Sequence, residues 1–309
     1  MEKPMDILSD FPVRKSKKQK QAFRQAVQAY CGALGYETVV EKGGFGAKNL
    51  VIGNPKTAKY LITAHYDTCA RLPFPNLLTP CSFPLFLGYQ ILLALGILTP
   101  PVILTMLTAL LTRSPEITKG VWILSACAVF GMVFAGKANR HNANDNTSGV
   151  VTVLEIAKTM PKNLRGQACF MLFDLEEAGL FGSSAYQSAH KQETKNQVIL
   201  NFDCVGDGDQ ILFFPTKKLK KDKAKLSPLY GCCGYFGKKS VLIRDKGFSV
   251  YPSDQGNFPY GVGIAAFRKG KLGLYLSRIH TDKDTILEET NVNILRAAII
   301  SMIGSSAAQ

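Results

Sequence analysis

The sequence lacks two patterns that would place the protein outside the cell. Its eight cysteines are scattered and include no C-x-x-C pair, so they do not form a disulfide framework. The first residues, MEKPMDILSDFPVRKSKK, contain no apolar core of the kind that a secretory signal needs. We therefore expect a protein that begins in the cytoplasm, which is a reducing compartment.

Acidic residues are scarce relative to basic ones. The chain has 37 Lys and Arg against 23 Asp and Glu, a formal net charge of +14, which favours an anionic partner. The basic residues cluster at 14–20 (RKSKKQK) and 217–225 (KKLKKDKAK). Because no aromatic residue is interleaved with them, we expect no nucleic-acid partner. Solvated surface and attraction to anionic membrane lipid remain as interpretations.

Charge is missing altogether from two stretches, 83–111 and 121–136, which flank the polar segment TRSPEITK. The first is long enough to cross a bilayer, which needs about 20 residues, and the second is rather short. Pro100 and Pro101 are expected to kink or break the first. The alternative is a pair of buried core helices. We favour a transmembrane or interfacial hairpin over residues 81–136, inserted between two parts of one catalytic domain, 1–80 and 137–309.

Outside these stretches, strand-like and helix-like segments alternate. Helical spacing of apolar residues predicts helices at 15–34, 150–160 and 183–192. Short apolar runs predict strands at 37–41, 49–53, 60–64, 169–173 and 198–203, and KGGFGAK between the first two predicts a hairpin. This alternation is typical of an α/β sheet layered by helices.

Imidazole and carboxylate groups stand where several of these segments end. Only four histidines are present, and two of them lie beside acids in AHYDT and RIHTDKDT. Acids also end CFMLF and VILNF and occupy the polar turn NANDNTSG. Mixed imidazole and carboxylate ligands are typical of catalytic zinc sites, and two metals sharing one carboxylate would need five such groups. The candidate ligands are His65, Asp145, Glu177, Asp203 and His280.

The motifs HYD, NDNTSG, FDLEEAGLFGS, NFD and IHTDKDT occur in an order that resembles the di-zinc aminopeptidase family. This family includes bacterial leucyl aminopeptidases, aminopeptidase Y and the glutamate carboxypeptidases. The resemblance implies a mixed central sheet with helices on both faces, two Zn²⁺ ions and a peptide substrate. It implies that Asp145 bridges the two ions, that His65 and Asp203 complete one site, and that Glu177 and His280 complete the other.

The same resemblance assigns roles to residues that do not bind metal. Asp67 would orient His65. Glu176 would be the general base, and since adjacent residues in an extended chain point to opposite sides, it could face the substrate while Glu177 binds metal. Substrate contacts are expected from residues in and around SDQGNF, where a glutamine stands at a position that is often histidine in the family. These are Tyr251, Gln255 and Tyr260.

One departure from the family concerns spacing. His65 and Asp145 are 80 positions apart, whereas the family resemblance leads us to expect about twenty, and the apolar insertion accounts for the excess. We expect membrane lipid as a partner and the catalytic domain on the cytoplasmic side, because more basic residues flank the domain end of the hairpin than its connecting loop. The flanking residues are Arg71, Lys137 and Arg140 against Arg113 and Lys119.

Two other functions stay open. One is a single-zinc acyltransferase that resembles glutaminyl cyclase, and the other is an inactive binding module docked on a membrane. Of the remaining histidines, His141 is interpreted as marking the exit from the membrane segment into the loop, and His190 as a solvated residue at the end of a surface helix. Asp207 and Asp209 are interpreted as a turn or as an acidic rim that binds a substrate amine.

Overall fold

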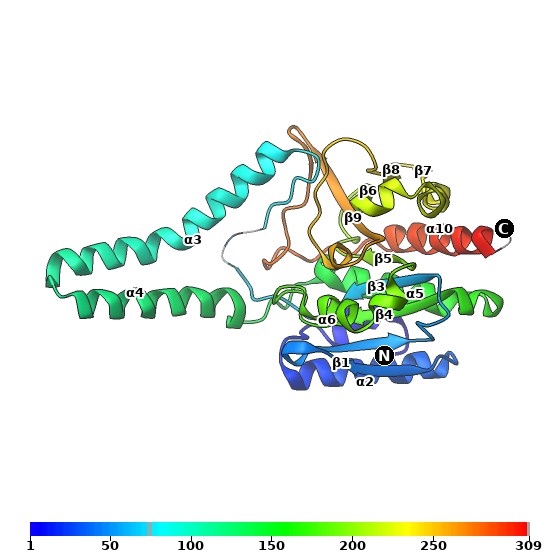
Figure 1. The fold of residues 1–309 in the computed structure, drawn as a ribbon, viewed down its shortest axis with the longest axis horizontal. Coiled ribbons are helices and arrows are strands. Elements are labelled where there is room, and N and C mark those ends of the chain that lie inside the picture. The colour runs from blue at the N-terminus through cyan, green and yellow to red at the C-terminus, as the bar shows by residue number, and fades with distance from the viewer. Residues whose placement is uncertain (73, 75, 308–309) are drawn as a thin grey trace.

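The computed structural model describes residues 1–72, 74 and 76–307. Its centre is a ten-stranded sheet with the strand order β1-β2-β4-β3-β5-β9-β6-β8-β7, and β10 pairs with β9 (Figure 1). Parallel and antiparallel pairs both occur, so the expected mixed sheet is confirmed. The strands are β1 Thr38–Lys42, β2 Lys48–Ile52, β3 Tyr60–His65, β4 Ala168–Phe173, β5 Val198–Phe202, β6 Gln210–Pro215, β7 Gly234–Phe236, β8 Lys239–Ile243, β9 Gly261–Gly270 and β10 Gly273–Tyr275.

Helices pack on both faces of the sheet, as expected. One face carries the larger apolar core, in which Phe23, Leu154 and Leu295 belong to three different helices. The opposite face carries a smaller core that includes Tyr186 and Phe258. The helices are α1 Ile7–Asp10, α2 Lys17–Ala33, α3 Phe83–Thr112, α4 Pro115–Phe130, α5 Gly149–Thr159, α6 Phe181–Ala189, α7 Lys191–Thr194, α8 Lys217–Lys221, α9 Lys223–Leu226 and α10 Glu289–Ala307.

Strands β3, β4 and β5 run parallel to one another in the middle of the sheet. His65 at the end of β3 is in register with Phe173 at the end of β4, and Thr63 of β3 is in register with Asn201 of β5. The loops that follow the three strands therefore leave the sheet at one edge. This edge receives the HYD, DLEE and FDC segments, as expected for ligand-binding groups in open α/β sheets.

The first basic segment contributes to the interior as well as to the surface. Ser16 caps α2, where its hydroxyl accepts a hydrogen bond from the backbone N–H of Gln19. Arg14 is fully buried, and the Lys20 ammonium lies 2.6 Å from the Asp174 carboxylate. The interpretation of residues 14–20 as a wholly solvated or lipid-facing segment is therefore wrong for these two residues.

The apolar insertion forms two helices, α3 and α4, that project from the domain as one arm (Figure 1). We call α3, α4 and the following turn to Val133 the arm. Its candidate spans, Phe83–Thr112 and Pro115–Val133, have mean hydropathies of 2.1 and 1.4 and are long and apolar enough to cross a membrane by length and composition. Only 6% of the first span's apolar window is buried and none of the second's, so the alternative of a buried core pair is wrong. Helix α3 continues through Pro100 and Pro101 without a break, and its axis bends partway along its length (Figure 1).

Candidate metal centre

The five candidate ligands come from separate parts of the chain and meet at the carboxyl edge of the sheet. His65 ends β3, Glu177 lies in the loop after β4, and Asp203 follows β5. Asp145 lies in the turn before α5, and His280 lies in the loop between β10 and α10. The structure thus brings together residues that are up to 215 positions apart, from His65 to His280.

Asp145 stands between the two imidazoles. Its Oδ1 lies 3.3 Å from His65 Nε2, and its Oδ2 lies 3.1 Å from His280 Nε2. Asp203 Oδ1 lies 3.7 Å from His65 Nε2, and Glu177 Oε2 lies 3.4 Å from His280 Nε2. One carboxylate therefore faces two histidine–carboxylate pairs, one with each of its oxygens.

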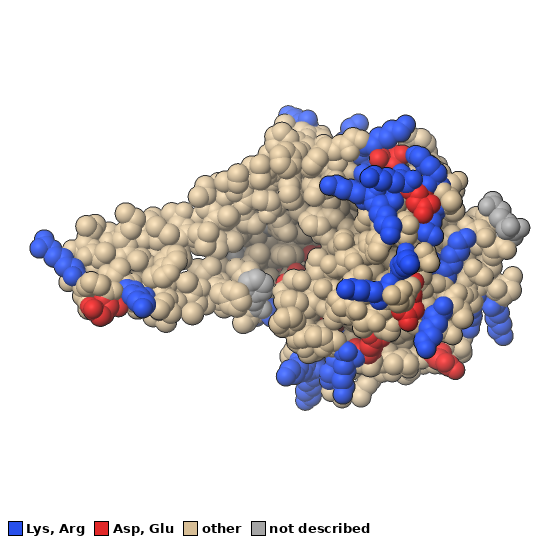
Figure 2. All heavy atoms as spheres, viewed as in Figure 1, with Lys and Arg blue, Asp and Glu red and all other residues tan. Residues whose placement is uncertain are grey.

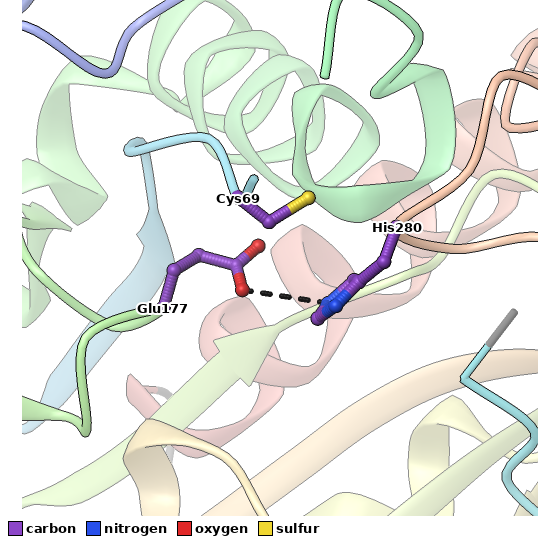
Figure 3. A group of neighbouring side chains, drawn as sticks. All are labelled: Cys69, Glu177 and His280. Carbon is purple, nitrogen blue, oxygen red and sulfur yellow. Dashed lines mark ion pairs between the residues drawn. The ribbon is translucent and has the colours of Figure 1, made fainter. Parts of the chain in front are cut away.

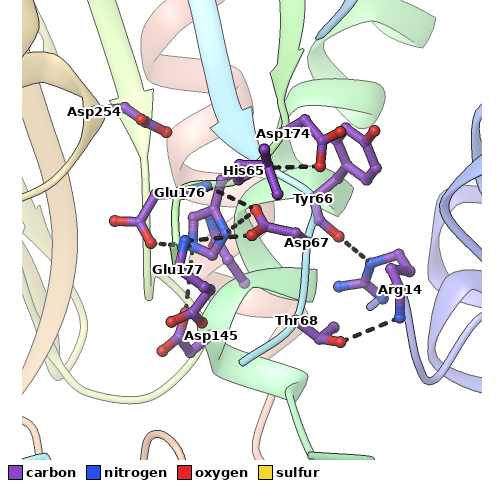
Figure 4. A network of polar contacts seen from close by, with 12 residues as sticks. Arg14, His65, Tyr66, Asp67, Thr68, Asp145, Asp174, Glu176, Glu177 and Asp254 are labelled. Atoms are coloured by element: carbon purple, nitrogen blue, oxygen red, sulfur yellow. Dashed lines mark hydrogen bonds and ion pairs between the residues drawn. The ribbon is translucent and has the colours of Figure 1, made fainter. Parts of the chain in front are cut away.

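Asp67 holds the two adjacent glutamates in place. Its Oδ1 accepts a hydrogen bond of 3.1 Å from the Glu176 backbone N–H, and its Oδ2 accepts one of 3.3 Å from the Glu177 N–H (Figure 4). Oδ1 also lies 3.5 Å from His65 Nδ1. Leu175, just before the pair, has a φ of 56°, a left-handed conformation that turns the chain out of β4. Asp67 thus fixes the Glu pair as well as lying against His65.

The two glutamates occupy different places around this cluster. Glu176 Oε2 lies 4.0 Å from His65 Nε2, on the side of Asp203, whereas Glu177 lies against His280. Figure 4 shows the two carboxyl groups pointing apart. This is the divergence that the sequence predicts for adjacent residues, although a turn and not a strand produces it.

Burial and mutual repulsion shift the acids of the cluster strongly. Burial raises the pKa of Glu177 to about 8; the His280 imidazole opposes this shift and the Asp145 carboxylate adds to it. Burial also raises the pKa of Glu176 well above its usual value. Asp145 is the exception, because its hydrogen bonds to both imidazoles outweigh burial and lower its pKa. These carboxyl groups are buried close together, so they cannot all be ionised unless positive charge lies beside them.

The imidazoles show the complementary effect. Burial alone would lower the pKa of His280, but the Glu177 and Asp145 carboxylates outweigh it and raise the pKa to about 9. In the same way the surrounding carboxylates overcome burial and raise the pKa of His65. Protons on these rings supply the positive charge that the carboxylates need.

A divalent cation would replace those protons, and the residues fit one. Sets of three ligand atoms lie within 4.8 Å of one another, among them the set from His65, Asp145 and Glu177. One buried polar atom of the cluster, Glu177 Oε1, makes no hydrogen bond. Imidazole nitrogens and carboxylate oxygens are the donors that zinc takes in catalytic sites. The cluster therefore has the chemistry of a zinc site.

Sequence reasoning missed Asp284, which holds the turn that carries Asp145. Its Oδ1 and Oδ2 accept hydrogen bonds of 2.8 and 2.9 Å from the backbone N–H groups of Asn144 and Asp145. Burial and the Asp145 charge raise the pKa of Asp284 to about 7. Its place in the motif IHTDKDT, four residues after His280, was the available signal.

Cys69 is a second residue that the sequence did not single out. Its sulfur lies within 4.8 Å of ligand atoms of Glu177 and His280 (Figure 3). The thiol is buried, and burial and the charge of Glu177 raise its pKa well above the usual value. It follows HYDT directly, so its position after Asp67 was the signal.

The three predicted substrate-binding residues are engaged inside the protein. The Tyr251 hydroxyl donates to the Asp203 backbone oxygen at 3.0 Å. The Gln255 amide donates to the Tyr251 carbonyl and accepts from Asn201 Nδ2, and its side chain is buried. Both residues thus support the loops around Asp203, and their contact with substrate stays a prediction.

Tyr260 lies at the other end of the sheet. It precedes β9, whose first residue pairs with Ile199 of the parallel strand β5, whereas Asp203 follows the far end of β5. Lys218 and Lys225 lie 4.8 and 5.0 Å from the centre of its ring. The structure therefore does not bring Tyr260 to the cluster, because adjacency to SDQGNF in sequence does not decide which edge of the sheet a residue reaches.

The remaining predictions concern acids and histidines at the periphery. His141 is exposed, but His190 stacks on Tyr186 and its Nε2 lies 2.9 Å from a Glu41 oxygen. Asp207 lies 2.6 Å from Arg268, and Asp209 lies 3.1 Å from Lys239. The acidic rim is therefore wrong, since both carboxylates are paired with cations.

A pocket of about 240 Å³ opens beside the cluster. Asp67, Glu177 and His280 line it on the domain side. Roughly 300–1,000 Å³ is usual for a site that encloses a whole ligand, so this pocket has room for the end of a chain and not for a long segment.

Two comparisons relate the sequence of the chain to known proteins. A sequence profile of peptidase family M28 matches residues 131–301, more than half of the chain. The matched region contains four of the five candidate ligands and Glu176, and it begins after His65. No curated protein sequence matches the chain.

Solved structures share the fold at low sequence identity. A Zn-dependent exopeptidase from Parabacteroides distasonis is 14% identical, with a TM-score of 0.59 over 97% of this chain and 94% of that one. The LapA aminopeptidase of Legionella pneumophila is 15% identical, with a TM-score of 0.56 over 97% of this chain and 68% of that one. Both likenesses concern the fold.

Proposed function

The chain belongs to peptidase family M28, and on this premise we propose that it is a membrane-attached aminopeptidase that uses two zinc ions. The observation that carries this proposal is the position of Asp145. Its two oxygens face two separate imidazoles at 3.3 and 3.1 Å, and each imidazole has a further carboxylate beside it. A carboxylate with this arrangement suits two ions better than one.

The protein groups divide the work as follows. His65 and Asp203 would hold one ion, Glu177 and His280 the other, and Asp145 both. When bound, zinc would polarise the scissile carbonyl and make water a stronger nucleophile. Glu176 would take a proton from the attacking water and pass it to the leaving amine, a task suited to a carboxyl whose pKa burial raises.

The small pocket supports removal of terminal residues. Its volume of about 240 Å³ accommodates a chain end beside the ligands. The two structural neighbours described above carry the names exopeptidase and aminopeptidase, which supports the same choice. A peptide would enter amino end first, with its first peptide bond next to Glu176 and the metal ligands.

The arm supports attachment to a membrane. Many large apolar side chains along α3 and α4 are exposed, and the face seen in Figure 2 carries charge on the arm only at its tip. Thr105, Thr108 and Thr112 each donate their hydroxyl to the backbone carbonyl four residues earlier. Hydroxyls satisfied within their own helix are what a lipid environment demands.

We place the catalytic domain on the cytoplasmic side. Arg71, Lys137 and Arg140 lie at the domain end of the arm, while the turn at its tip has Arg113, Lys119 and the acidic Glu116. An excess of basic residues marks the cytoplasmic end of a membrane segment. Protease added outside intact cells should leave the domain uncut, and cleavage of the domain there would reverse this topology.

Zinc content and hydrolysis test the activity together. Detergent-purified protein should bind two zinc ions per chain and release the first residue from a panel of aminoacyl anilides. One zinc per chain with cyclisation of amino-terminal glutamine would instead indicate the acyltransferase. No zinc and no turnover would indicate an inactive binding module, and either result would overturn the proposal.

A further inference from the structure

We propose that the catalytic pocket admits its substrate from the membrane side, so that the substrates are peptides whose free amino end is followed closely by an apolar, membrane-embedded segment. This inference rests on the proposed aminopeptidase function and on attachment through the arm. It adds the class of peptide and the direction from which the peptide arrives.

The first observation is that the arm forms part of the pocket wall. Val133, the last residue of the second candidate membrane span, lines the same pocket as Glu177 and His280. Ala70 and Leu72, on the chain that leads toward α3, line it as well. Three apolar residues of the pocket wall thus belong to the end of α4 or to the segment leading into α3, although Lys15 and Lys20 line the pocket too.

The second observation is that the chain segments leading into and out of the arm are bonded to the loops of the metal centre. The Leu72 N–H donates to the His280 carbonyl at 2.8 Å, and the Asn139 N–H donates to the Cys69 carbonyl at 3.0 Å. The chain entering the arm is also bonded to the chain leaving it, since the Arg71 N–H donates to the Lys137 carbonyl at 2.8 Å. These bonds fix the pocket at the base of the arm.

The third observation is the shape of the space in front of the pocket. Helices α3 and α4 meet at the tip of the arm and separate toward the domain (Figure 1). In Figure 2 the surface between the separated helices and the domain is hollowed, and acidic atoms are visible at its inner end. The surface of the arm around this hollow is free of charge in that view.

The two walls of the pocket differ in chemistry, and one kind of peptide matches both. The inner side carries the proposed metal ligands Glu177 and His280, where the amino end and the first peptide bond would lie, and Val133 offers apolar surface on the outer side. Lys15 and Lys20 also line the pocket, and Lys20 is paired with Asp174. A peptide that follows the hollow would pass from the pocket into the space between α3 and α4, which a bilayer would fill with lipid.

A series of linker lengths tests this inference. Full-length protein is reconstituted in phosphatidylcholine vesicles with peptides that share one amino-terminal sequence and end in an apolar helix of about 20 residues. A polar linker of either two or about 20 residues separates the amino end from the helix, and a third peptide lacks the helix. We expect the short-linker peptide to be cleaved with a kcat/KM at least equal to that of the long-linker peptide.

The outcomes separate this inference from the activity itself. If the soluble and long-linker peptides are cleaved but the short-linker peptide is at least tenfold slower, the pocket opens away from the membrane and the inference fails. If none of the three is cleaved by zinc-loaded protein, the proposed aminopeptidase function fails first.

Matched variants locate the effect. Val133→Trp should narrow the membrane-side wall and lower cleavage of the short-linker peptide at least tenfold relative to the soluble peptide. Val129→Trp, one turn earlier and outside the pocket lining, should leave that ratio unchanged. Equal ratios in the two variants would contradict a role for the base of the arm in substrate entry.

Discussion

Exchanging each of the two adjacent glutamates for glutamine should separate proton transfer from metal binding. Glu176→Gln keeps the size of the side chain, and it keeps the hydrogen bond that the backbone N–H of residue 176 donates to Asp67. It removes only the carboxylate that is the proposed base. General bases contribute about 10²–10⁴ in rate, and each tenfold is about 1.4 kcal/mol. We therefore expect kcat to fall by about 10²–10⁴, a loss of roughly 3–5 kcal/mol, with both zinc ions retained.

Glu177→Gln should give the opposite pattern. Glu177 Oε2 lies 3.4 Å from His280 Nε2 and its Oε1 has no hydrogen-bond partner, so the substitution removes a ligand and not a base. Loss of a group that only supports a ligand costs about 10–100-fold in metal affinity, and loss of a ligand should cost at least that much. Zinc affinity should fall about 100-fold or more, most visibly as one ion lost per chain.

The metal-free proteins provide a check that does not depend on activity. Burial raises the pKa of Glu177 to about 8, because its negative charge is costly to bury. At pH values above 8, Glu177→Gln should therefore raise the Tm of the metal-free protein. The same variant should gain less Tm from added zinc than the wild type does. Calorimetry with and without zinc measures both. Loss of zinc by Glu176→Gln, or near-normal kcat in that variant, would refute the separation of roles.

Three further predictions concern stability. Folding raises the pKa of Asp284 from an ordinary 3.8 to about 7, so the folded protein favours the protonated carboxyl. The Tm of the metal-free protein should therefore fall between pH 4 and pH 7, as Asp284 loses its proton. Asp284→Asn should make the Tm less dependent on pH in this range. Arg14→Met should lower the free energy of unfolding by about 2–4 kcal/mol, measured with denaturant, because the carbonyl oxygens of Phe11 and Tyr66 lose their donor. Lys18→Met, at an exposed position, should leave the free energy of unfolding unchanged. Gly182→Ala should lower the free energy of unfolding by about 2 kcal/mol or more, because the added Cβ would lie 2.0 Å from the backbone oxygen of Asp174. Gly166→Ala is the control, because a Cβ there would meet no atom within 4 Å.

The sequence was sufficient for the local elements and for the candidate ligands. The strand expected at 60–64 is β3, and the helix expected at 15–34 is α2. Both follow from apolar periodicity, which depends only on neighbours in the chain. Three of the candidate ligands, His65, Glu177 and Asp203, follow parallel strands, whose ends share one edge whatever the strand order. Asp145 and His280 lie in other loops, and the motifs of the family resemblance indicated them.

The rest depends on which strand lies beside which, and periodicity does not contain that information. Strand β9 pairs in parallel with β5 and in antiparallel with β6, and this decides that Tyr260 lies far from Asp203. Likewise nothing local distinguishes Arg14, which is buried, from the exposed lysines that follow it. Hydrogen bonds such as those from Asn144 to Asp284 join segments 140 residues apart and appear only once the fold is known.

The two candidate spans of the arm are unequal, with 30 and 19 residues. At 1.5 Å per residue they measure about 45 and 28 Å, against a hydrocarbon thickness of about 30 Å. In a bilayer the shorter span would match this thickness, while the longer one would have to tilt, and a thicker or thinner bilayer would change the tilt. The segments leading into α3 and out of α4 are bonded through Leu72 and Asn139 to the loops of His280 and Cys69, so hydrophobic mismatch would act on the metal centre itself. Turnover in vesicles of longer and shorter acyl chains would then report membrane thickness.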